Sequence, residues 1–123
     1  MWFAKARQDL KTAKHLRPLE PDFYSGIVFH CQQSSEKAIK GFLTHHNIRV
    51  LKTHDMDKLL ESLGKVNPAL TEKYSELRHF TKYAVEYRYP DVDLKLKPLT
   101  TEIVEASLKL AEAVLNELSD SLN

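Results

Sequence analysis

The chain has 123 residues, a formal net charge of +1 and 42% hydrophobic residues. This length suits one domain with a core, and the near-neutral charge excludes the strongly basic surface of a general nucleic-acid-binding protein. Three glycines and five prolines are too few for the turns of a many-stranded sheet. A single cysteine excludes an internal disulfide, and no apolar run approaches the ~20 residues of a membrane span. We therefore expect a helical, cytoplasmic protein without a membrane part.

The first predicted helix has apolar residues at alternating steps of three and four, which line one helix face. They are Phe3, Ala6, Leu10, Ala13 and Leu16. Pro18 and Pro21 end this helix, and Asp22 is placed to cap the next one. Residues 1–17 carry five basic side chains against one acid, whereas residues 98–123 carry five acids against one lysine. The opposite charges predict that the first and last helices lie side by side.

The second predicted helix covers about residues 23–47 and is apolar on two stripes, so it should be central. Gly26 and Gly41 inside it indicate close helix–helix approach. Long polar side chains cluster at residues 32–40, where Glu36 and Lys40 have the spacing of a local ion pair. Lys37 is the member of this cluster for which the sequence offers the weakest structural role.

Three further helices follow in the pattern. Residues 56–63 form a short helix that Thr53 or Asp55 caps and Gly64 ends; a fourth helix runs from Asn67-Pro68 to about residue 84, and the last begins at Thr100 or Thr101. Short connections between amphipathic helices predict an all-α, up-and-down bundle of about five helices with a four-helix-bundle core, forming a single domain over residues 1–123.

Two places in this pattern suit a phosphate-bearing ligand. His54 lies at a predicted helix start, where free backbone N–H groups favour an anion, although a solvated loop histidine is the alternative. Near the end of the fourth helix, Arg78, Arg88 and Tyr89 combine planar donors for phosphate with an aromatic stacking face. Pro90 should force Arg88 and Tyr89 out of helical geometry into a loop. A protein interface, or pairing of Arg88 with a nearby aspartate, would also explain this segment.

Other kinds of chemistry are poorly represented. Adjacent His45 and His46 point about 100° apart on a helix, no set of ligands repeats at metal spacing, and Cys31 lies on an apolar stripe unsuited to a thiolate. No glycine-rich phosphate loop, nucleophile elbow or paired-carboxylate motif is present. The sequence therefore predicts no metal and no cofactor.

Four blocks in order over nearly the whole chain resemble the HEPN domain family, named for nucleotide binding in higher eukaryotes and prokaryotes. The blocks are residues 2–13, 29–40, 53–56 and 87–91. The resemblance implies a helical bundle, usually a homodimer, often encoded beside a minimal nucleotidyltransferase in a toxin–antitoxin pair. It also implies, for many members, a metal-independent ribonuclease with an Arg-x(4–6)-His motif near the start of a late helix.

This sequence departs from the ribonuclease pattern. No histidine follows Arg78 or Arg88 at the required spacing, and the one formal match, Arg49 to His54, lies in a loop instead of a late helix. We therefore expect a dimeric nucleotide-binding and interaction module that serves a nucleotidyltransferase, and no catalytic residue is assigned. Two alternatives remain. One is a toxin ribonuclease in which Arg88, or Arg78 with His79, works with His54 across a dimer; the other is a dimeric scaffold without nucleotide binding. The predicted ligand is an ATP-like nucleotide or RNA, and its predicted contacts are Lys37, His54, Arg78, Arg88 and Tyr89.

Overall fold

The computed structural model describes residues 1–17, 23–50, 52–91 and 94–122, and in these ranges the chain forms six helices and no strand. The helices are α1 (Trp2–Leu16), α2 (Tyr24–His45), α3 (Met56–Val66), α4 (Pro68–Lys73), α5 (Leu77–Arg88) and α6 (Thr101–Asp120). The predicted all-α bundle is confirmed, although it has six helices where about five were expected. No helix in the described part combines the length and apolar character needed to cross a membrane.

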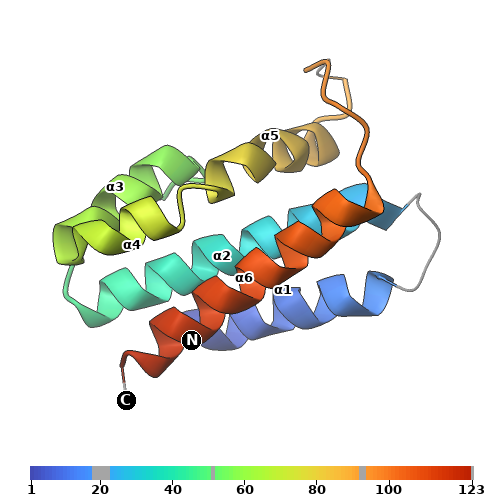
Figure 1. The fold of residues 1–123 in the computed structure, drawn as a ribbon. Coiled ribbons are helices and arrows are strands. Elements are labelled where there is room, and N and C mark those ends of the chain that lie inside the picture. Colours follow the sequence, from blue (N-terminus) through green and yellow to red (C-terminus); the bar gives the residue numbers. More distant parts are fainter. Residues whose placement is uncertain (18–22, 51, 92–93, 123) are drawn as a thin grey trace.

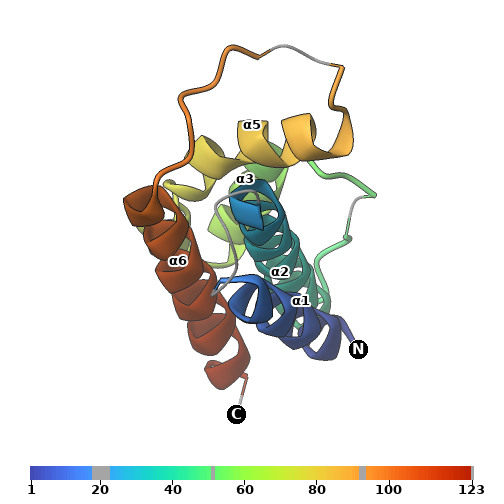
Figure 2. The same ribbon diagram turned by 90° about the vertical axis from the view of Figure 1, so that its right-hand side faces the viewer.

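The helix α2 is the centre of the bundle. α1, α5 and α6 pack directly on it, α3 also contacts it, and α4 lies against α3 (Figure 1). Viewed from one end, α6 lies on one side of α2, whereas no helix is drawn on the opposite side, between α1 and α5 (Figure 2). In the described part of the chain, one face of the central helix therefore has no helix over it.

The main core lies between α2, α3 and α6. Most of its largest fully buried side chains are aliphatic and come from all three helices, among them Ile27, Ile39, Leu43, Leu59, Leu60, Leu63, Val104, Val114 and Leu118; Met56 and the polar Gln32 are buried with them. α1 adds Ala6 and Ala13, both fully buried. The predicted pairing of the first and last helices is confirmed, because Lys14 Nζ lies 3.2 Å from Glu112 Oε1 and Arg17 contacts Glu105.

Three predicted helix starts are confirmed by side-chain caps. Asp55 accepts a hydrogen bond from the Asp57 N–H at 3.0 Å, Asn67 accepts one from the Ala69 N–H at 3.1 Å, and Thr100 accepts one from the Ile103 N–H at 3.2 Å. The predicted cap at Asp22 and the stops at Pro18 and Pro21 lie outside the described residues.

The predicted fourth helix is wrong as one element, since the chain turns at residues 74–76 and forms α4 and α5. Tyr74 is almost fully buried, and its hydroxyl binds the Glu117 carboxylate on α6. Leu70, Tyr74 and Leu77 keep helical spacing through the turn, so hydrophobic periodicity alone could not reveal the break.

Gly64 does not end the third helix, because α3 continues to Val66. A Cβ at Gly64 would lie 2.7 Å from the Thr71 hydroxyl oxygen, so the missing side chain allows α4 to pack closely on α3. The prediction that Pro90 forces Arg88 out of the helix is also wrong. Arg88 lies within the last turn of α5, and only Tyr89 leaves helical geometry.

The two glycines of α2 differ in how closely a neighbour approaches. A Cβ at Gly41 would lie 2.9 Å from Trp2 Cβ and 3.0 Å from the Phe3 ring, whereas at Gly26 the nearest atom is 3.6 Å away. The predicted close approach is thus confirmed at Gly41, where α1 meets α2, and is wrong at Gly26.

This difference makes the two glycines a matched pair for a stability experiment. We expect Gly41→Ala to lower the free energy of unfolding by about 1–3 kcal/mol, because the methyl group overpacks the α1–α2 contact. Gly26→Ala, with ordinary contact distances, should raise it by roughly 0.5–1 kcal/mol through helix propensity. Urea unfolding measures both variants, and equal effects would contradict the close approach at Gly41.

Candidate functional site

The uncovered side of α2 is lined by polar and aromatic residues, and we refer to it as the polar face. Its members form two overlapping series at steps of three and four residues, 29-33-36-40 and 30-33-37-40, so they share one broad side of the helix between α1 and α5. They are Phe29, His30, Gln33, Glu36, Lys37 and Lys40. Gln33, Glu36 and Lys40 are buried.

On the α1 side of the polar face, Asp9 joins two basic residues. Its Oδ1 lies 3.2 Å from His30 Nδ1, and its Oδ2 contacts the Lys37 ammonium. Both basic side chains and Asp9 are largely shielded from solvent. The expectation that Lys37 lacks a structural partner is therefore wrong, since α1 supplies a carboxylate directly beneath it.

On the α5 side, Glu36 and His54 form a second acid–histidine pair. Glu36 Oε2 lies 3.0 Å from His54 Nδ1, and the Glu36 side chain is only 5% exposed while that of His54 is 62% exposed. Burial raises the pKa of the Glu36 carboxyl, while the hydrogen bond and charge of His54 and the charges of Lys40 and Arg88 act in the opposite direction. Glu36 binds His54 across the loop instead of forming the predicted helical pair with Lys40.

Arg88 completes this side of the polar face. Its guanidinium carbon lies 5.3 Å from the centre of the Phe29 ring, and the Tyr87 ring stacks on the same Phe29 at 4.6 Å between centroids. Tyr87 and Tyr89 are both exposed residues. Arg88 thus lies over an aromatic ring near the buried Glu36. Of the two aspartates considered as its partner, Asp91 forms no ion pair with it among the described residues, and Asp93 lies outside them.

Gln33 is a buried member of the polar face with an unpaired amide nitrogen. It is 9% exposed, and its Nε2 has no hydrogen-bond partner among the described residues. Beside it, Lys40 places its ammonium 5.6 Å from the centre of the Trp2 ring. A buried amide donor without a protein acceptor usually binds water or a ligand. The Gln33 amide therefore offers a hydrogen-bond donor to an acceptor that binds between α1 and α5.

Of the residues predicted to bind a nucleotide, Lys37, His54, Arg88 and Tyr89 lie on or beside the polar face. Arg78 does not, because it pairs with Asp57 at the start of α3. Asp9, Phe29, His30, Gln33, Glu36 and Lys40 were not predicted as site residues. Their sequence signal was the three-to-four spacing of polar residues from 29 to 40 and the one acid in the basic first helix.

Two other kinds of site, a metal site and a reactive thiol, find no support in the described part of the chain. There, no three His, Cys, Asp or Glu side chains are grouped as a metal ion would require. Cys31 is 2% exposed, and burial raises the pKa of its thiol to about 11, so it stays protonated at neutral pH.

Comparison with known proteins agrees with the predicted resemblance. The HEPN domain family model matches residues 1–121. The chain belongs to the HEPN domain family. A Methanocaldococcus jannaschii protein named "Putative toxin MJ1304" is 29% identical over 134 residues, covering 99% of this chain and 86% of that protein. The crystal structure of ST0689, an archaeal HEPN homologue, superposes with a TM-score of 0.73 at 23% identity, covering 99% of this chain and 95% of that one. The second likeness concerns the fold of this HEPN chain alone.

Proposed function

We propose that this HEPN chain binds the phosphate groups of a nucleotide on the polar face. The observation that carries the proposal is that Lys40, His54 and Arg88 all act on the buried Glu36, on the helix face that also carries the unpartnered amide of Gln33. Arginine offers a planar fork for phosphate oxygens, and lysine offers a point charge. Three basic side chains and an amide donor near one buried carboxylate suit an anion with several oxygens.

The aromatic residues beside these donors suit the base of the same nucleotide. Tyr87 and Tyr89 are exposed next to Arg88, and Tyr87 is already held by stacking on Phe29. Stacking on an aromatic side chain is tolerant of base identity. An ATP-like nucleotide would place its base on these rings and its phosphates over α2.

The biological setting follows from the resemblance. We propose a single-domain, cytoplasmic, dimeric HEPN module over residues 1–123 that serves a separately encoded nucleotidyltransferase in a toxin–antitoxin type of pair. The toxin name of the Methanocaldococcus jannaschii relative supports the toxin part of this proposal.

Calorimetric titration with ATP tests the binding proposal. Binding should release or absorb heat, and it should raise the melting temperature, because a ligand that binds only the folded state stabilises it. Affinity should also fall as salt is increased, since phosphate contacts are screened. If millimolar ATP produces no heat and no shift in melting temperature, the proposal is rejected.

A second candidate function, a metal-independent ribonuclease, is favoured by the Glu36–His54 contact. A buried carboxylate that holds one ring nitrogen of an exposed histidine is the arrangement of a general base. His54 would take the proton of a ribose 2′-hydroxyl, whose oxygen bonds to phosphorus as the bond to the 5′-oxygen breaks. That proton would then pass from His54 to the departing 5′-oxygen, while Arg88 offsets the phosphate charge.

Labelled single-stranded RNA in EDTA distinguishes this second candidate. The wild-type chain is compared with a His54→Ala, Arg88→Ala double variant, which removes the base and the cation together. Cleavage by the wild type that is no faster than cleavage by the double variant would reject the ribonuclease and leave nucleotide binding standing.

A further inference from the structure

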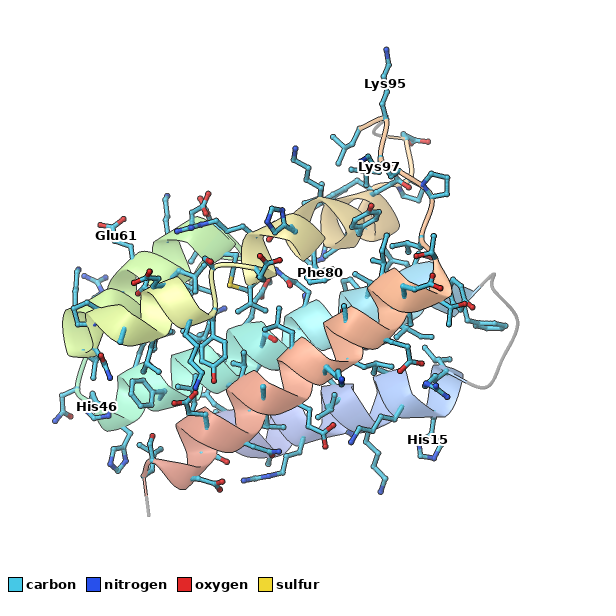
Figure 3. All side chains as sticks on the ribbon, viewed as in Figure 1. His15, His46, Glu61, Phe80, Lys95 and Lys97 are labelled. Atoms are coloured by element: carbon cyan, nitrogen blue, oxygen red, sulfur yellow. The ribbon has the colours of Figure 1, made fainter. Side chains whose placement is uncertain are left out.

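A second surface feature of the bundle lies on the other side of α5 from the polar face. A groove of about 380 Å³ lies between α5 and α6, with Phe80, Ala106 and Leu110 as its apolar lining. Phe80 lies between these two helices in the view of Figure 3. Glu76 stands at the α5 wall of the groove and Lys109 at the α6 wall.

The groove exists because α5 and α6 both pack on α2 without packing extensively on each other. α6 has a second apolar stripe beside the one buried in the core, at steps of three and four residues: Ile103, Ala106, Leu110 and Ala113. Ala106 and Ala113 are exposed, while Ile103 and Leu110 are half-buried. A half-covered apolar stripe opposite a phenylalanine is typical of an interaction surface.

The charges at the groove match those of a second copy of the same chain. Across the described residues Lys109 has no ion pair, and the nearest base to the Glu76 carboxylate is His79 at 3.8 Å. A two-fold axis along the groove would place α5 of each copy over α6 of the other, and each residue would keep its position along that axis. Glu76 of one copy would then face Lys109 of its partner, and the same pair would form twice.

We propose that two copies of this HEPN chain associate through the α5–α6 groove, with Phe80 and Leu110 buried at the centre and Glu76–Lys109 pairs at the rim. The inference rests on the dimer in the proposed function and names its surface. It leaves the polar face of both copies open to a ligand.

A charge exchange tests the contact while keeping the apolar core of the groove. Glu76→Lys or Lys109→Glu alone sets like charges opposite each other twice, and each should weaken the dimer about tenfold. The double variant restores opposite charges in reversed order and should recover the wild-type dissociation constant. Glu61→Lys, the same change on the exposed surface of α3, is the control and should leave it unchanged (Figure 3).

Sedimentation velocity over a range of concentrations measures these constants, with circular dichroism to compare folding. Weakening by both single variants with recovery in the double variant supports the groove contact. A dimer that is indifferent to all three variants overturns it and leaves the proposed dimer in place. A chain that is monomeric at every concentration, or that pairs only with a nucleotidyltransferase, overturns the groove contact and the dimer, whereas ATP binding is judged separately by calorimetry.

Discussion

Replacing Arg88 with alanine is expected to weaken ATP binding about 10- to 100-fold. Arg88 is fixed over the Phe29 ring and is the one planar donor beside Glu36 and His54 in the proposed site. A hydrogen bond to a charged group contributes roughly 1.5–3 kcal/mol, which corresponds to this range of affinity. Arg88→Lys should retain part of the affinity, since it keeps the charge and loses the fork. Calorimetry at fixed salt measures all three proteins.

Arg78→Ala provides the matched control for this prediction. Arg78 is also an arginine of α5, but it pairs with Asp57 on α3 and not with the polar face. Its removal should change the ATP dissociation constant less than twofold, and chemical unfolding should show that both alanine variants remain folded. Equal losses in the two variants would contradict the location of the proposed site.

Helix starts were predictable where a side-chain cap fixed them, whereas the glycine and proline rules misplaced the ends of α3 and α5. Asn67 followed by Pro68, Thr100 and Asp55 all act as the caps that their residue types predict. The turn at residues 74–76 was not predictable, because it is stabilised by a long-range contact of Tyr74 with Glu117. No local breaker marks it, and the apolar spacing continues through it.

The site was predictable in its parts and not in its assembly. His54 and Arg88 could be chosen by residue type, but their common neighbour Glu36 was assigned to a helical pair with Lys40. The partner of Lys37 lies 28 positions earlier, at Asp9. These pairings depend on how α1, α5 and the loop before α3 surround α2, and a pattern read along one helix does not contain that information.

The burial of Glu36 has an energetic consequence for the whole fold. Its carboxyl is removed from water at the centre of the polar face, and burial outweighs the hydrogen bond and nearby positive charges in setting its pKa above the ordinary value of 4.5. Burying a charged group in this way opposes folding unless its partners compensate fully. A carboxylate maintained at a cost in stability is common at functional sites.

Replacing Glu36 with glutamine is therefore expected to stabilise the protein at neutral pH. Between pH 4.5 and the raised pKa, the folded state keeps a proton that the unfolded state has lost, so the stability of the wild type falls as pH rises through this window. Glu36→Gln removes that dependence. The variant should exceed the wild type by about 1 kcal/mol, or a melting temperature roughly 4 °C higher, at pH 7. Below pH 4 the two proteins should have the same melting temperature.

Thermal melts from pH 3.5 to pH 8 check this prediction. Glu61→Gln, at an exposed position of α3, is the control, and its melting temperature should equal that of the wild type at every pH. A variant that is less stable than the wild type at pH 7 would mean that the His54 contact more than offsets the burial of Glu36. The same variant separates the two candidate functions, because they require opposite things of this carboxylate. Phosphate binding should tighten when a negative charge leaves the polar face, whereas ribonuclease activity should fall when His54 loses the carboxylate that orients it.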